Sequence, residues 1–142
     1  MKVVIESLGG VASRVRLGRH DLTFDQEATV PGGEDRGPSP LDVMATAVGA
    51  CAHYYVAAFL FGRQHPAAGL RVEVEFEKGR DPVPRLATFS IHVFLPEGVP
   101  ERYLAGIERA VRHCPAYGTF LHPPEIELAV HPGGAATSAP AA

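Results

Sequence analysis

The chain has 142 residues, of which 46% are hydrophobic and 20% are charged, as is ordinary for a globular domain. Its formal net charge is −3 and its lysines and arginines are scattered, which argues against a nucleic-acid partner. The first residues read as an alternating strand and lack the features of a signal peptide, so we expect a cytoplasmic protein. We expect a single domain over residues 1–130 and a disordered tail over residues 131–142.

The N-terminal part of the sequence predicts an antiparallel meander followed by a long loop. Short alternating segments around residues 1–7, 11–17 and 20–24 are separated by turns that contain glycine. Residues 28–40 contain three prolines and three glycines, which neither a helix nor a central strand tolerates. Long loops of this kind are often functional.

The most apolar segment of the chain is residues 41–61, which are too long for a strand and predict a helix. Ser39 can act as its N-cap, and Pro40 suits the first helical position. Residues 43–62 carry no formal charge, so a membrane-spanning helix is the alternative. Frequent alanine and glycine, His53 in the middle and polar strands on both sides favour a buried central helix, and we expect no membrane partner.

The second half of the sequence predicts a hairpin, a shorter helix and a last strand. Residues 70–78 and 87–95 alternate between apolar and polar side chains, as expected for a hairpin with one wet face. Residues 101–113 carry one apolar stripe and predict a helix that Pro115 stops. Residues 125–130 predict a short strand.

Together these elements predict an α+β fold with antiparallel sheets, a long central helix and a second, shorter helix. The central helix is apolar on more faces than one sheet can cover. We therefore expect a homodimer in which a second subunit covers the remaining face of this helix.

Cys51 and Cys114 are the only cysteines, and each lies on the apolar face of a predicted helix. Cytosolic reductants keep ordinary thiols reduced, so the pair is not a structural disulfide scaffold. Packing of the two helices could bring the sulfurs together, as a thiolate, sulfenic acid and disulfide cycle requires. The alternative is a pair of buried, inert thiols, which is a common fate of free cysteine.

A reactive Cys51 needs a nearby cation, because a thiol in the middle of a helix gains little from the helix dipole. The candidate side chains are Arg14, Arg16, Arg19, Arg36 and Arg112.

Two other site chemistries fit the sequence less well. Zinc could be bound by the two cysteines with His53 and either His113 or His122. However, Cys51 and His53 point to different sides of a helix, and the sequence contains no Cys-x-x-Cys pair. A serine or cysteine hydrolase is weaker still, since no Gly-x-Ser-x-Gly motif occurs. We therefore expect no metal, flavin or haem.

Two motifs surround the cysteines. One covers residues 31–33, 37–44 and 47–51, from the proline- and glycine-rich loop to Cys51, and the other covers residues 108–115 and ends just after Cys114. Both resemble the OsmC/Ohr family of organic hydroperoxide resistance proteins, and the order of elements is similar from about residue 1 to residue 130. The resemblance implies an intertwined homodimer with active sites at the subunit interface, a peroxidatic Cys51 and a resolving Cys114.

The resemblance also implies groups that activate Cys51. Well-studied peroxidases of this family hold the thiolate with an N-terminal arginine and a glutamate before the central helix. In this chain Leu41 stands at the glutamate position and Asp42 is the nearest acid, which resembles the OsmC-like branch more than the Ohr branch. Arg14 or Arg19 would supply the cation, with Arg14 preferred. Asp42 could equally serve the first turn of the helix.

The sequence therefore predicts an organic hydroperoxide reductase, a thiol peroxidase that an external dithiol resets. Val48, Tyr55 and Phe59 could form an apolar pocket beside Cys51 for the organic peroxide. The alternative is a weakly catalytic or non-catalytic protein of the same fold that binds a small apolar ligand at the dimer cleft.

Overall fold

Two antiparallel sheets and three α-helices make up the computed structural model, which describes residues 2–133. A three-stranded sheet contains β1 (Val4–Gly9), β2 (Ala12–Leu17) and β3 (His20–Phe24), and a hairpin contains β4 (Arg71–Gly79) and β5 (Arg85–Phe94). The helices are α1 (Pro40–Phe61), α2 (Leu104–Arg112), which follows a 3-10 turn at Glu101–Tyr103, and α3 (Pro115–Leu121). The predicted α+β class with antiparallel sheets is confirmed.

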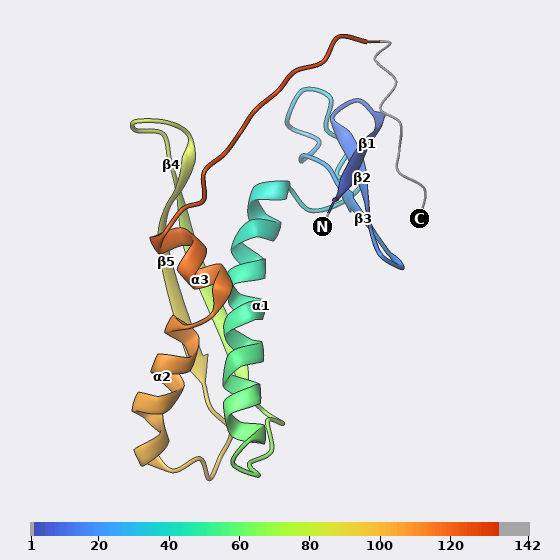
Figure 1. Ribbon diagram of the computed structural model, residues 1–142. Coiled ribbons are helices and arrows are strands. Elements are labelled where there is room, and N and C mark those ends of the chain that lie inside the picture. The colour runs from blue at the N-terminus through green and yellow to red at the C-terminus, as the bar shows by residue number, and fades with distance from the viewer. Residues whose placement is uncertain (1, 134–142) are drawn as a thin grey trace.

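The hairpin and the helices α2 and α3 lie alongside α1, whereas the N-terminal sheet stands beyond the first turn of α1 (Figure 1). Strand order in the N-terminal sheet is β1-β2-β3, so this sheet is the meander that the alternating segments predict. The main core contains Val56 and Leu60 of α1 and Ile107 of α2, with partly buried side chains packed against them that include Val93 of β5 and Val111 of α2.

The loop between β3 and α1 is held by one buried carboxylate. Asp25 is 2% exposed. It accepts hydrogen bonds from the backbone N–H groups of Gln26, Glu34 and Arg36, at 2.8, 3.2 and 3.1 Å. The amide of Arg36 contributes most to lowering the pKa of this carboxyl group. These hydrogen bonds hold the loop against the end of β3, and the loop leads directly into α1.

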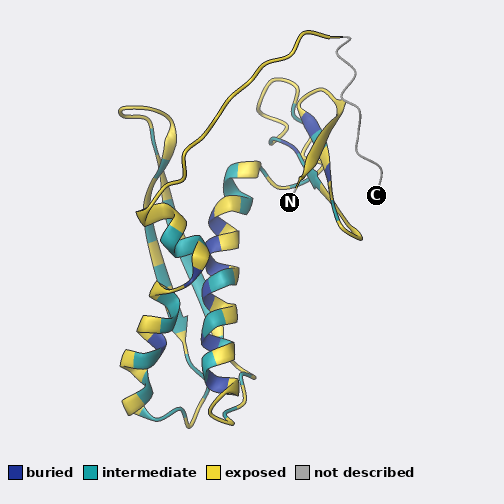
Figure 2. Ribbon diagram, viewed as in Figure 1, coloured by how far each residue is buried: buried dark blue, intermediate teal, exposed yellow. Residues whose placement is uncertain are grey.

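Helix α1 begins as its sequence predicts. The Ser39 hydroxyl accepts a hydrogen bond from the Asp42 amide at 3.2 Å, and Pro40 occupies the first turn. One face packs against β4 and the other helices, and its buried residues are Ala45, Val48, Gly49, Ala52, Val56 and Leu60. The other face is largely open (Figure 2). By length and composition α1 could also cross a membrane, a test that core helices pass as well.

Two differences from the sequence prediction lie near the C-terminal end. Pro115 does not only end α2, because it also begins a third helix that the prediction missed. The predicted strand over residues 125–130 is wrong for the single chain, since this segment belongs to no sheet among residues 2–133. Its apolar side chains are almost fully exposed, with Ile126 at 87%, Leu128 at 88% and Val130 at 87%.

The predicted disordered tail, residues 131–142, lies outside the described residues from 134 onward. Residues 131–133 are exposed and belong to no helix or strand.

Gly49 gives a direct test of how α1 packs on the hairpin. A Cβ atom at Gly49 would lie 2.5 Å from Cγ2 of Val74 in β4. We expect Gly49→Ala to destabilise the protein by about 1 kcal/mol, because overpacking outweighs the gain in helix propensity. Urea unfolding at a fixed protein concentration measures this.

Gly118→Ala is the matched control, since nothing lies within 4 Å of a Cβ atom at this helical glycine. It should leave stability unchanged or raise it. Adding Val74→Ala to Gly49→Ala should remove most of the Gly49→Ala penalty. Equal effects of the two glycine substitutions would contradict the packing described here.

Candidate functional site

The structure brings the two cysteines together, although they lie far apart in the sequence. Cys51 is half-buried in the middle of α1. Cys114 is 1% exposed and is the N-cap residue of α3. Both are free thiols, and Cys51 lies close enough to Cys114 to raise the pKa of the Cys114 thiol. The missed helix α3 is thus the element that carries the second thiol to the first.

The electrostatic surroundings of the two thiols differ. Burial raises the pKa of the Cys114 thiol, and its interaction with Cys51 raises it further. The backbone N–H groups of Tyr117 and Ala116 act in the opposite direction but do not cancel these effects. Cys114 therefore stays protonated near neutral pH and is shielded from solvent, whereas Cys51 is the more accessible sulfur. This arrangement suits Cys51 as the attacking thiol and Cys114 as its partner.

Asp42 is fully engaged at the start of α1. Its carboxylate accepts a hydrogen bond from the Ser39 hydroxyl at 2.7 Å and pairs with Lys78 Nζ of β4 at 3.0 Å. The Ser39 hydrogen bond contributes most to the lowered pKa of Asp42, followed by Lys78. Within one chain, Asp42 therefore caps α1 and ties it to the hairpin, and its partner cation is a lysine that the sequence did not single out.

Within one chain, the N-terminal arginines are remote from the thiols. Arg14 lies on β2 and forms an ion pair with Glu6 at 3.8 Å, with both side chains largely exposed. Arg19 lies in the turn between β2 and β3. Figure 1 shows this sheet standing away from the middle of α1, where Cys51 lies. The N-terminal sheet therefore places neither Arg14 nor Arg19 beside Cys51 of the same chain.

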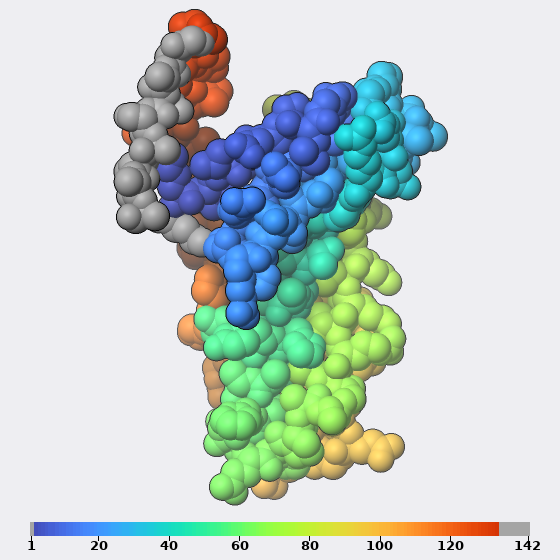
Figure 3. Space-filling model, turned by 90° about the vertical axis from the view of Figure 1, so that its right-hand side faces the viewer, coloured from blue at the N-terminus to red at the C-terminus, as the bar shows by residue number. Residues whose placement is uncertain are grey.

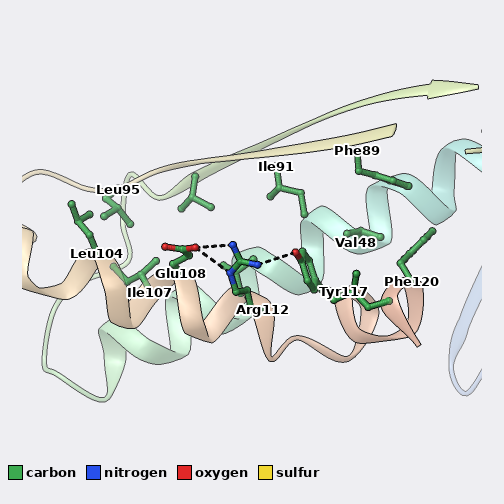
Figure 4. Close-up of a pocket in the computed structure, with 13 residues that line it drawn as sticks. Val48, Phe89, Ile91, Leu95, Leu104, Ile107, Glu108, Arg112, Tyr117 and Phe120 are labelled. Atoms are coloured by element: carbon green, nitrogen blue, oxygen red, sulfur yellow. Dashed lines mark hydrogen bonds and ion pairs between the residues drawn. The ribbon is translucent and has the colours of Figure 1, made fainter. Parts of the chain in front are cut away.

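A cavity of about 610 Å³ lies between β5, α2 and α3 (Figure 4). Val48 of α1 lines it, whereas Tyr55 and Phe59, the other residues predicted beside Cys51, do not. Apolar side chains make up most of the wall, and the polar ones are Glu108, Arg112 and Tyr117. Neither thiol lines the cavity.

The zinc alternative finds no support in the geometry. Across residues 2–133, no group of three or more His, Cys, Asp and Glu side chains is placed to hold a metal ion. His53 is exposed on α1, and the Nδ1 atom of His113 lies 2.7 Å from the Arg109 carbonyl oxygen.

Comparison with known proteins identifies the class to which this fold and site belong. The family model described as OsmC-like protein matches residues 32–129. The match includes α1, the hairpin and the helices that carry both cysteines. The chain belongs to the OsmC-like protein family, and the resemblance seen in the sequence is confirmed.

Solved structures support the same fold. A Psychrobacter arcticus protein assigned to the osmotic stress and detoxification response is 17% identical, with a TM-score of 0.75 over 87% of this chain and 89% of that chain. An organic hydroperoxide resistance protein from Legionella pneumophila is 15% identical, with a TM-score of 0.63 over 84% of this chain and 89% of that chain. One from Elizabethkingia anophelis is 18% identical, with a TM-score of 0.60 over 84% and 88%. No curated protein matches the chain.

The two thiols should differ in reactivity with an alkylating agent. In Cys51→Ser, where Cys114 alone remains, we expect alkylation by iodoacetamide at pH 8 at least about ten-fold slower than in Cys114→Ser. The pKa obtained from the pH dependence of Cys114 alkylation should lie above the ordinary thiol value of 9.0, because burial disfavours the thiolate. Mass spectrometry of quenched samples gives both rates. Equal rates would contradict the burial of Cys114.

Proposed function

We propose that this chain is a thiol-dependent peroxidase that reduces organic hydroperoxides to alcohols. The contact between Cys51 and the buried, protonated Cys114 is the observation that carries the proposal. The family match and the similarity in fold to organic hydroperoxide resistance proteins support it. The proposed setting is the cytoplasm, where small and protein-bound dithiols are available to reset the enzyme.

The proposed cycle has three steps. The Cys51 thiolate attacks the terminal peroxide oxygen, the O–O bond breaks, and the alkoxide takes up a proton and leaves as the alcohol. The resulting Cys51 sulfenic acid condenses with the Cys114 thiol, so that an S–S bond forms, the S–O bond breaks and water leaves. An external dithiol then reduces the disulfide and is itself oxidised. The cycle uses no metal or organic cofactor.

We further propose that the working unit is a homodimer paired along α1. The open face of this helix carries apolar or small side chains at alternating spacings of three and four, which is a helix-pairing pattern. These residues are Met44, Ala47, Cys51, Tyr54, Ala58 and Phe61. Figure 3 shows α1 uncovered along this face of the molecule. Tyr54 is 65% and Phe61 is 84% exposed, a large apolar surface to leave in water.

The dimer would also complete the site. Cys51 belongs to the open stripe, so the second copy would cover it and exclude water. We propose that Arg14 of the second copy, or failing that Arg19, supplies the cation that stabilises the Cys51 thiolate. The role of Asp42 would then be to fix the start of α1, through Ser39 and Lys78, at the edge of that interface.

Peroxide consumption tests the activity. With cumene hydroperoxide and an excess of dithiol, Cys51→Ser should fall to the uncatalysed rate, because the attacking sulfur is gone. Cys114→Ser should still consume one equivalent of peroxide in the absence of dithiol, since only the condensation step is blocked. Ferrous oxidation of xylenol orange measures the remaining peroxide. Wild-type rates in Cys51→Ser would overturn the proposal.

A second candidate function is non-catalytic binding of a small apolar molecule, which the cavity of about 610 Å³ favours. An anilinonaphthalene dye should then bind saturably to the wild type and not to Ile91→Glu, which places a carboxylate in the cavity wall. This result supports the binding function only if the wild-type protein also leaves peroxide unchanged. Peroxide turnover would make the same cavity the place for the organic part of the substrate.

Assembly along α1 is tested with a pair of matched substitutions. Ala58 and Ala105 are both exposed helical alanines, but only Ala58 lies on the open stripe of α1. Ala58→Glu should weaken the dimer about 100-fold or more, because it buries an unpaired carboxylate. Ala105→Glu should leave the dimer intact. Sedimentation equilibrium measures both, and a monomeric wild type or a dimeric Ala58→Glu variant would contradict pairing along α1.

A further inference from the structure

A short chain of polar side chains spans the junction between α2 and α3. Arg112, the last residue of α2, donates hydrogen bonds from Nε and Nη2 to Glu108 Oε1 at 3.1 and 2.8 Å. Its Nη1 donates to the Tyr117 hydroxyl of α3 at 3.4 Å. Figure 4 shows these contacts from Glu108 through Arg112 to Tyr117. Glu108 also raises the pKa of Arg112, which keeps the guanidinium charged.

This chain of contacts bridges the turn that contains Cys114. Only His113 and Cys114 separate α2 from α3, so the direction of α3 depends on the backbone at these two residues. Tyr117 is in the first turn of α3, and its backbone N–H faces the Cys114 thiol. The hydrogen bond from Arg112 therefore holds the turn that sets where the Cys114 sulfur points.

The placement of this sulfur matters for disulfide formation. A disulfide needs the two sulfurs at about 2.05 Å and a narrow range of dihedral angles. The two thiols are free in this structure, so the Cys114 sulfur must approach Cys51 before the S–S bond can form. We infer that Arg112 and Tyr117 are positioning residues that hold α3 so that the Cys114 sulfur faces Cys51 when the disulfide forms. The part this role plays in a peroxidase cycle rests on the proposed function. The hydrogen bonds that position α3 are independent of that proposal.

The test uses an oxidant that bypasses the peroxide. Diamide is an azo compound that takes two hydrogens from two thiols, becoming a hydrazine as the disulfide forms. In Tyr117→Phe and in Arg112→Gln, we expect the rate of Cys51–Cys114 disulfide formation by diamide to fall about three- to ten-fold. Alkylation of Cys51 should change less than about two-fold in the same variants, because Cys51 belongs to another helix.

Arg109→Gln is the matched control, as it removes a second exposed arginine from the last turn of α2. It should form the disulfide at the wild-type rate. Wild-type rates in both Tyr117→Phe and Arg112→Gln would overturn the inference, as would an equal loss in Arg109→Gln. Because diamide replaces the hydroperoxide, a slow disulfide step in an enzyme without peroxidase activity would uphold the positioning role and refute only the proposed function.

Discussion

The site depends on the turn between α2 and α3, which places Cys114 close to Cys51 in the middle of α1. Small residues on the packed face of α1, such as Ala45, Gly49 and Ala52, let neighbouring elements approach closely. Burial shields Cys114 and raises the pKa of its thiol, whereas Cys51 is only half-buried. The two cysteines therefore differ in accessibility, as the proposed attacking and resolving thiols must.

Much of the fold could be predicted from local patterns. The alternation in β4 and β5, the turns of the meander and the Ser39-Pro40 start of α1 depend on neighbours in the sequence. The third helix was predictable in principle, because Pro115 suits the first turn of a helix as Pro40 does. Local pattern misleads at residues 125–130. Their alternation predicts a strand, but this segment pairs with none of the described strands of the single chain.

The candidate site was predictable only in part. Cys51 and Cys114 stand out because they are the only cysteines and lie in the two motifs. The cation that pairs with Asp42 could not be identified from the sequence, because Lys78 comes from a strand far along the chain. Likewise, nothing local in the sequence marks Asp25 as the carboxylate that gathers the loop amides. The cation that we propose for Cys51 would depend on packing between chains, which periodicity within one chain does not encode.

The open stripe of α1 links the proposed dimer to the proposed reaction of Cys51. Cys51 lies in this stripe, so pairing of two helices would bury apolar surface and the reactive sulfur at the same time. The hydrogen bonds of Asp42 and Asp25 act at a distance from the sulfur, where they fix the start of α1 and the loop before it.

The central claim is that peroxide chemistry begins at Cys51 and ends in a bond to Cys114. Its most direct measurement is intact-mass and peptide analysis of the reduced protein after one equivalent of cumene hydroperoxide. We predict a loss of two hydrogen atoms and a peptide pair linked through Cys51 and Cys114. Two free thiols in an unchanged protein, or a disulfide only between Cys114 residues of different chains, would contradict the claim.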